Sequence, residues 1–206
     1  MTSRGPALLV LAKAPEPGRV KTRLCPPLTP EQAADLAAAA LLDSLAAVRA
    51  VRDAEPVAVL TGDVERAARR HALRAALARV HVVTQRGEGL GARILAAHLD
   101  TAALLPHRRT LQIGMDTPQV SPKLLADADT VLSTPGVDAV LGLARDGGWW
   151  ALGLRDPATA ALVSAVPTSR EDTGVRTLAA LRGGGLRVAL LPELSDVDTM
   201  TDARLV

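Results

Sequence analysis

Short apolar runs alternate with amphipathic stretches along most of this chain. The pattern predicts strands at residues 7–12, 56–61, 80–84, 110–114, 138–143, 149–154 and 187–191. Between most of them, apolar residues recur at helical spacing, which predicts helices at about 30–51, after Asp63, and at about 90–104, 121–132 and 172–181. Strands joined by helical crossovers form mostly parallel sheets that are covered on both faces. The expected fold is therefore an α/β three-layer sandwich with a mostly parallel sheet, formed by one domain over residues 1–206.

Length and composition narrow the class of protein. The chain has 206 residues, of which 48% are hydrophobic, and one cysteine, Cys25, so no internal disulfide is expected. It has no apolar run of membrane-spanning length and no secretory segment at its start, which favours a cytoplasmic protein without an integral membrane segment. The four histidines are scattered and show no metal-ligand spacing.

Charge and aromatic content argue against nucleic acid as the main partner. The net charge is only +2, and the chain has no Phe, no Tyr and two Trp. Nucleic-acid binders commonly combine a basic groove with several aromatic platforms. A small-molecule partner is therefore favoured.

The segment after the first predicted strand concentrates positive charge. Between Ala12 and Arg23 lie four cations, Lys13, Arg19, Lys21 and Arg23, with Glu16 as the only acid and with Gly18 in the middle of the segment. Two of the three lysines of the chain are here. Open α/β sheets bind ligands at the carboxyl ends of their strands, and clustered cations suit phosphates. The alternative is a solvated basic loop.

Two further loops are expected at the same edge of the sheet. Gln85, Arg86 and Gly87 open a glycine-rich loop after the third predicted strand, and its exposed amides suit a base edge or a phosphate. An ordinary glycine-rich turn is the alternative. Asp116 follows the fourth predicted strand and is the candidate Mg²⁺ or Mn²⁺ ligand, since such an ion needs only one or two carboxylates if a nucleotide supplies phosphate oxygens. A role for Asp116 in a turn is also possible on sequence grounds.

Two acidic segments complete the candidates. Asp146 and two glycines precede the strand that begins with Trp149 and Trp150. Because successive side chains of a strand face opposite ways, one Trp should enter the core and the other should face a cleft, unless both are structural. Asp198 is a candidate second metal ligand, and the neighbouring threonines alternatively cap a final helix.

Five ordered motifs together resemble a bacterial family of small glycosyltransferase-like proteins, long grouped as a domain of unknown function, within the nucleotide-diphospho-sugar transferase superfamily. The motifs are Ala12-Lys13-Ala14-Pro15 with Pro17–Leu24, Gln85-Arg86-Gly87 with Leu90-Gly91, Gly114–Pro118, Asp146–Trp150 and Asp196–Thr199. More distant similarity extends to molybdenum-cofactor and phospholactate guanylyltransferases. Where relatives often show Trp-Ser-Thr before the fifth helix, this chain has Pro167-Thr168-Ser169.

The resemblance implies a GT-A type fold that binds a nucleotide or a nucleotide sugar with a divalent cation. It implies that Lys13, Lys21 and Arg23, in the loop that includes Ala12 and Gly18, hold phosphates. It places Gln85, Arg86 and Gly87 near the base, and Mg²⁺ or Mn²⁺ on Asp116.

The leading hypothesis is a metal-dependent glycosyl transfer from a nucleotide-activated sugar to a small or lipid-like acceptor. Lys21 and Arg23 would stabilise the departing diphosphate, and Asp146 would orient or deprotonate the acceptor. A nucleotidyltransferase that releases pyrophosphate from a nucleoside triphosphate is the first alternative. A nucleotide-binding protein without turnover is the second. The sequence does not define the oligomeric state.

Overall fold

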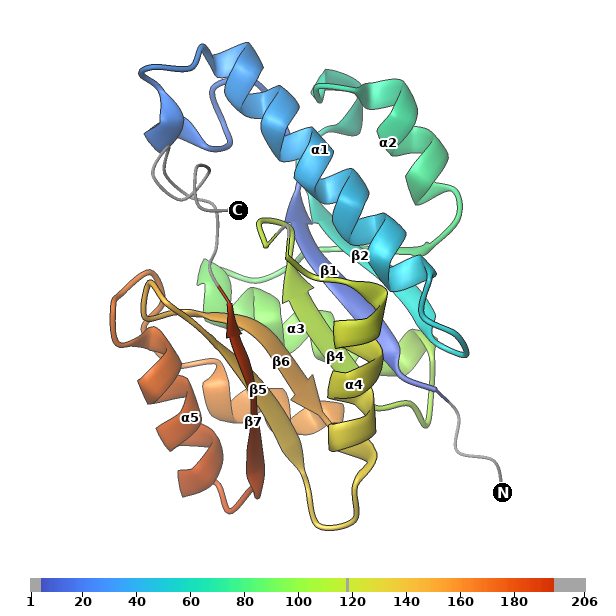
Figure 1. The fold of residues 1–206 in the computed structure, drawn as a ribbon, viewed down its shortest axis with the longest axis vertical. Coiled ribbons are helices and arrows are strands. Elements are labelled where there is room, and N and C mark those ends of the chain that lie inside the picture. The colour runs from blue at the N-terminus through green and yellow to red at the C-terminus, as the bar shows by residue number, and fades with distance from the viewer. Residues whose placement is uncertain (1–4, 118, 195–206) are drawn as a thin grey trace.

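The computed structural model describes residues 5–117 and 119–194, and these residues contain one seven-stranded sheet with the order β3-β2-β1-β4-β6-β5-β7 (Figure 1). Strand β6 runs antiparallel to both of its neighbours, and every other pairing is parallel. The mostly parallel sheet expected from the sequence is confirmed. The strands are β1 (Ala7–Lys13), β2 (Glu55–Thr61), β3 (His81–Thr84), β4 (Thr110–Gly114), β5 (Ala139–Ala144), β6 (Trp149–Leu154) and β7 (Val188–Leu194).

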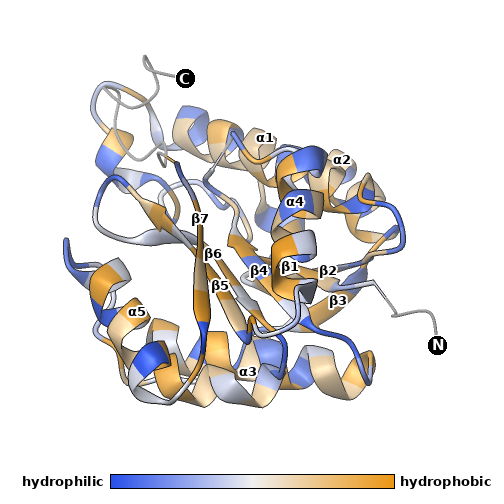
Figure 2. Ribbon diagram, turned by 60° about the horizontal axis from the view of Figure 1, so that its bottom comes forward, coloured by the Kyte–Doolittle hydropathy of each residue, from blue (hydrophilic) through white to orange (hydrophobic). Residues whose placement is uncertain are grey.

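Helices cover both faces of the sheet and complete a three-layer sandwich (Figure 2). One face packs against α1 (Pro30–Arg49), α2 (Arg70–Leu77) and α4 (Pro122–Ser133). The other packs against α3 (Gly89–Leu104), α5 (Thr173–Gly183) and the 3₁₀ helix η3 (Pro157–Val163). Two single-turn 3₁₀ helices, η1 (Thr22–Leu24) and η2 (Val64–Arg66), lie in the loops after β1 and β2.

The apolar sequence of β1 explains its central place in the sheet. Leu8 and Val10 pack into the core on the α1 side, whereas Ala7 and Leu9 pack into the core on the opposite side. All four side chains are at most 1% exposed. A strand buried on both faces needs such a continuous apolar run, which distinguishes it from the alternating pattern of a half-exposed strand.

The start of α1 agrees with the capping signal that the sequence carries. Thr29 and Gln32 form the expected capping box, in which the Gln32 N–H donates to Thr29 Oγ1 at 3.2 Å and the Thr29 N–H donates to Gln32 Oε1 at 2.9 Å. The 3₁₀ helices η1 and η3 were not expected, because such short segments carry no clear apolar periodicity.

The direction of the strands determines which loops meet. The carboxyl ends of β1, β2, β3 and β4 share one edge of the sheet because these strands are parallel. Strand β6 is antiparallel to β4, so the turn before β6 reaches the same edge. The expected convergence of the loops after β1, β3 and β4 is thereby confirmed, and the β5–β6 turn joins them.

Candidate functional site

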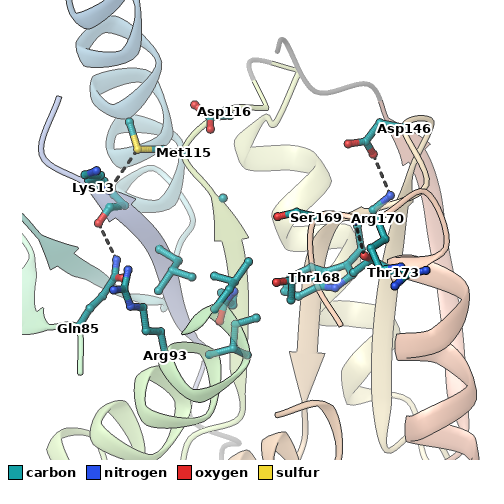
Figure 3. A pocket seen from close by; sticks show the side chains of 18 of the residues that line it. Lys13, Gln85, Arg93, Met115, Asp116, Asp146, Thr168, Ser169, Arg170 and Thr173 are labelled. Carbon is teal, nitrogen blue, oxygen red and sulfur yellow. Dashed lines mark hydrogen bonds between the residues drawn. The ribbon is translucent and has the colours of Figure 1, made fainter. Parts of the chain in front are cut away.

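A cleft of about 640 Å³ opens at this edge of the sheet, and we refer to it as the rim cleft. Figure 3 shows two opposed sets of side chains with open space between them. The β1 side carries Lys13, Arg23, Gln85, Arg93 and Asp116, and the β6 side carries Asp146, Trp149, Thr168, Ser169 and Arg170. The volume lies within the usual range for small-molecule sites, roughly 300–1,000 Å³.

The loop after β1 is held by polar contacts within the loop and with the loop after β2. The Lys13 ammonium donates to the Arg19 carbonyl at 3.0 Å. Glu16 is only 2% exposed, and its Oε1 accepts from the Asp63 N–H at 3.1 Å. Arg19 and Arg66 flank the Glu16 carboxylate at 3.7 and 3.6 Å. The single acid of the loop is thus turned into the protein, and it is absent from the lining of the rim cleft.

Lys21 and Asp116 form an ion pair next to the rim cleft. Lys21 Nζ lies 3.1 Å from Asp116 Oδ1, and the Lys21 side chain is only 8% exposed. Lys21 also has a left-handed backbone, with φ of 48°, which costs free energy for a residue with a Cβ. The two residues line, together with Thr22 and Arg23, a smaller cavity of about 210 Å³ that shares Arg23 and Asp116 with the rim cleft.

Gln85 supports the wall of the cleft. Its Nε2 donates to the carbonyls of Ala12 at 2.6 Å and Val59 at 2.9 Å, and it thereby joins the loop after β3 to the ends of β1 and β2. Ala12 lines the cleft with it. The Gln85 amide therefore fixes the backbone where the basic loop begins.

Besides Lys21, three predicted residues among the described ones lie outside the lining of the rim cleft. Arg86 is turned along the surface of α3, where its guanidinium donates to both carboxylate oxygens of Asp100 at 2.7 and 2.6 Å. The Gly87 carbonyl accepts from Arg93 Nε at 3.3 Å. Gly18 has φ of 73°, and a Cβ there would meet no atom within 4 Å.

The β6 side is assembled by close backbone packing. The Gly174 N–H donates to the Gly147 carbonyl at 2.7 Å, and a Cβ on Gly147 would overlap the carbonyl of Glu171. Thr173 Oγ1 accepts from the Arg170 N–H at 3.1 Å and donates to the Pro167 carbonyl at 3.2 Å. The segment before α5 is therefore clamped onto the turn before β6.

Asp146 belongs to this clamped turn. Its Oδ1 accepts from the Gly148 N–H at 2.9 Å, which orients the carboxylate, and Asp146 lines the rim cleft. The two tryptophans that follow diverge as predicted. Trp150 is 1% exposed and donates its Nε1–H to the Pro192 carbonyl at 2.9 Å, whereas Trp149 lines the rim cleft. One indole anchors the core and the other is available to a ligand.

The donor set at Asp116 is compatible with a divalent cation only if a ligand completes it. The described residues contain no group of three or more His, Cys, Asp or Glu that could hold an ion. Asp198, the second predicted ligand, lies outside the described residues. Mg²⁺ commonly takes one or two carboxylates and fills its other positions with water and substrate phosphates, which one accessible Asp satisfies. Asp116 has 39% of its side chain exposed, so it meets that requirement.

Several lining residues were missed at the level of sequence. Arg93 is on the first turns of α3, Gln112 is in β4, and Thr168, Ser169 and Arg170 precede α5. Gln112 carried a usable signal, since it is a polar residue inside the apolar run of β4. The segment before α5 was marked in the sequence only by its departure from the family motif, and its place opposite the loop after β1 follows only from the fold.

Solved structures share this fold. A protein of Desulfovibrio desulfuricans G20 named "putative nucleotide-diphospho-sugar transferase" is 28% identical, with a TM-score of 0.84 over 97% of this chain and 85% of that chain. A nucleotidyl transferase from Methanothermobacter is 17% identical, with a TM-score of 0.64 over 98% and 95%. The glucosyl-3-phosphoglycerate synthase of Mycobacterium tuberculosis, bound to Mn²⁺ and UDP, is 13% identical, with a TM-score of 0.57 over 94% and 71%. The chain therefore has the fold of the nucleotide-diphospho-sugar transferase superfamily.

The family follows from the sequence match. Residues 44–170 match the family described as "Uncharacterized protein conserved in bacteria (DUF2064)", so the chain belongs to this family. No curated protein sequence matches the chain significantly. Among the described residues, no helix has the length and apolar character required to cross a membrane.

Proposed function

We propose that this protein is a transferase that uses a nucleotide-activated sugar and passes the glycosyl group to a small or lipid-like acceptor with the help of Mg²⁺ or Mn²⁺. The main observation that supports this proposal is that one cleft combines two chemically different sides. Lys13, Arg23 and Asp116 line the cleft and offer a setting for a diphosphate and its cation. Asp146 lies across the cleft from Lys13 and Asp116 (Figure 3), and Trp149, on β6, lines the cleft as well. A donor and an acceptor could be held together there.

The charge of the β1 side suits the difficult part of this reaction. As the bond between the anomeric carbon and the diphosphate oxygen breaks, negative charge develops on the leaving nucleoside diphosphate. Lys13 and Arg23, which line the cleft, and Lys21, which lies beside Asp116, would stabilise that charge. One well-positioned electrostatic group contributes about 3 kcal/mol to such a transition state. With a divalent cation on Asp116, the phosphate charge would be neutralised further.

We assign to Asp146 the orientation and deprotonation of the acceptor hydroxyl. An acceptor hydroxyl oxygen would form the new bond to the anomeric carbon, and its proton would pass to the Asp146 carboxylate. The hydrogen bond from the Gly148 N–H to Asp146 Oδ1 holds that carboxylate in one orientation, which general-base catalysis requires. Trp149, beside it, offers a flat apolar surface for a sugar ring or an apolar acceptor.

We propose that the nucleotide base lies near the loop after β3, and we assign it fewer contacts than the phosphates. Gln85 lines the rim cleft and fixes the Ala12 carbonyl, which supports a base near the loop after β3. Arg86 and Gly87 would join such a site only after a change in their contacts, because Arg86 is engaged with Asp100. Gly18 would contribute backbone freedom to the phosphate loop.

Nucleotidyl transfer is the second candidate. The nucleotidyl transferase of Methanothermobacter has a TM-score of 0.64 with this chain, and the glucosyl-3-phosphoglycerate synthase has a TM-score of 0.57, so the fold is shared with both kinds of transferase. In this alternative the acceptor would attack the α-phosphorus of a nucleoside triphosphate, and pyrophosphate would leave. The same cations would stabilise the negative charge on the departing pyrophosphate.

Thermal shift measurements provide the first test. Nucleoside triphosphates, diphosphates and nucleotide sugars are screened with and without Mg²⁺ or Mn²⁺, since a ligand at 100 times its dissociation constant adds about 2.7 kcal/mol of stability. The expected result is a metal-dependent shift with a nucleotide sugar. Product analysis then separates the candidates: nucleoside diphosphate supports glycosyl transfer, and pyrophosphate supports nucleotidyl transfer. Binding without any product would favour a non-catalytic nucleotide-binding protein.

A matched pair of variants tests the role of Asp116. Asp116→Ala should abolish the metal-dependent part of the shift. Asp127→Ala removes an exposed carboxylate of α4 that pairs with Lys123 outside the rim cleft, so it should leave the shift intact. An unchanged metal dependence in Asp116→Ala would overturn the proposed metal ligand, and the absence of any nucleotide shift in the unaltered protein would overturn the nucleotide site itself.

A further inference from the structure

The ion pair between Lys21 and Asp116 joins two residues to which opposite tasks are assigned. Asp116 is the proposed ligand of a divalent cation, and Lys21 is proposed to stabilise the charge of phosphates. Yet Lys21 Nζ lies 3.1 Å from Asp116 Oδ1, so the ammonium group already neutralises the carboxylate. Both tasks can be performed only if this pair separates when the ligand binds.

A divalent cation and the Lys21 ammonium compete for the same carboxylate. The Lys21 side chain is only 8% exposed, so water and salt screen its charge weakly. A metal ion on Asp116 would be repelled by this ammonium at short range, where the interaction between like charges is strongest. Free Mg²⁺ or Mn²⁺ therefore meets an unfavourable site as long as Lys21 holds Asp116.

The backbone of Lys21 is fixed, whereas its side chain adjoins open space. The Leu24 N–H donates to the Lys21 carbonyl at 2.9 Å, and the Leu24 side chain is buried, which holds this turn in place. The cavity of about 210 Å³ that Lys21 lines shares Arg23 and Asp116 with the rim cleft. A phosphate that enters from the rim cleft would reach the Lys21 ammonium there. The flexible four-carbon side chain of lysine can follow such a partner while the backbone stays in place.

We propose that Lys21 makes Asp116 selective for a cation that arrives together with phosphate. Without phosphate, Lys21 occupies Asp116 and excludes the free ion. When a metal–diphosphate complex binds, Lys21 releases the carboxylate to the cation and donates to a phosphate oxygen instead, so each charge keeps a partner. This inference rests on the proposed function, and it gives Lys21 a selective role in addition to the stabilisation of phosphate charge.

A matched pair of lysine variants tests this exchange. Binding of Mn²⁺ alone is measured without any nucleotide, from the electron paramagnetic resonance signal of the free ion. Lys21→Met removes the competing ammonium and should raise the affinity for Mn²⁺ by about tenfold. Lys13→Met removes another ammonium of the same loop, one that donates to the Arg19 carbonyl, so it should change this affinity much less. A gain in affinity is a result that a loss of structure would not produce.

Two further variants locate the effect. Lys21→Arg keeps the positive charge, so Mn²⁺ alone should bind to it as weakly as to the unaltered protein. The double variant Lys21→Met with Asp116→Ala lacks the carboxylate, so the gain seen in Lys21→Met should disappear. A gain that persists in the double variant would place the ion elsewhere and would overturn the exchange.

Inorganic pyrophosphate tests the second half of the exchange. In the unaltered protein, Mn²⁺ and pyrophosphate together should bind more tightly than their separate affinities predict, because Lys21 gains a phosphate oxygen as it releases Asp116. The two ligands also associate in solution, but this contribution is the same for every variant. The coupling between them should be about tenfold smaller in Lys21→Met. Equal coupling in both proteins would overturn the exchange.

The outcomes separate this inference from the proposed function. Equal affinities of the unaltered protein and Lys21→Met for Mn²⁺ alone would overturn the exchange and leave the nucleotide site in place. No binding of any nucleotide by the unaltered protein, with or without metal, would overturn the proposed function.

The unaltered protein provides a second test if Lys21→Met does not fold. The chain has three lysines, so ¹³C spectra of lysine-labelled protein contain few signals, which Lys→Arg variants assign. The Lys21 signal should shift with Mg²⁺ and pyrophosphate together but not with Mg²⁺ alone. A shift with Mg²⁺ alone would overturn the exchange, and so would the absence of a shift when both are bound.

Discussion

The two sides of the rim cleft are built by different physical means. On the β1 side, charged groups hold one another: Glu16 lies between Arg19 and Arg66, and Lys21 pairs with Asp116. On the β6 side, backbone segments are packed so closely that only glycine fits at Gly147. Ion pairs can be exchanged for contacts with ligand phosphates, whereas close backbone packing cannot adjust. The β1 side is thus suited to bind charge, and the β6 side is suited to select shape.

A matched pair of glycine variants gives the sharpest test of this difference. Gly147→Ala should destabilise the protein by about 4 kcal/mol, because a Cβ there overlaps the Glu171 carbonyl and the backbone is left-handed, with φ of 88°. Gly18→Ala on the β1 side should cost only about 1 kcal/mol, because φ is 73° but no atom lies within 4 Å of the added Cβ. Chemical denaturation measures both free energies of unfolding. Equal losses in the free energy of unfolding would show that the backbone on the β6 side can shift to accommodate the added Cβ.

His98, a fully buried histidine of α3, provides the next largest effect. The pKa of His98 is lowered by burial from its ordinary value of 6.5 to about 4. Between these values the unfolded chain binds a proton that the folded protein does not, so stability falls as the pH decreases from 6.5 to 4. The full contribution is about 3 kcal/mol. Above pH 6.5 this contribution is complete and constant.

Denaturation at several pH values between 6.5 and 4.5 checks this expectation. His98→Asn keeps a short polar group near Thr110 and removes the titratable ring, so its stability should change less over the same interval. If His98→Asn has the same pH dependence as the unaltered protein, the loss of stability at lower pH comes from carboxylates and not from His98. Asp138 contributes little in this interval, because Arg187 holds its pKa at about 2.

One arginine from each side tests where charge is recognised. Arg23→Ala should weaken the binding of pyrophosphate by about 2 kcal/mol, or about thirtyfold, because it removes a charge-assisted contact on the β1 side. Arg170→Ala removes a lining residue of the β6 side that already faces Asp172 at 3.4 Å, and the affinity for pyrophosphate should stay the same. Titration calorimetry at two salt concentrations measures both. Equal losses would mean that both sides bind phosphate.

The same comparison explains how far the sequence could predict the molecule. Strands such as β1 and β4 were found almost to the residue, because their apolar runs are a local signal, and the basic loop and Asp116 followed from their positions after those strands. Thr168, Ser169 and Arg170 were not found, because their place opposite β1 depends on a clamp between Gly147 and Gly174 that forms only in the folded chain. Local chemistry identified the charged side of the cleft, and tertiary packing created the other.

Arg86 marks where the sequence and the structure lead to different expectations. Its motif placed it near the base, yet its guanidinium donates to both oxygens of Asp100 and does not line the rim cleft. Arg86→Ala should therefore leave nucleotide affinity unchanged, and the loss of its exposed ion pair should change stability little. Gln85→Ala, its neighbour, should lower the affinity because the Ala12 carbonyl loses its hydrogen bond. If both variants lose the same affinity in nucleotide titrations, Arg86 leaves Asp100 when ligand binds, and the β1 side extends to the start of α3.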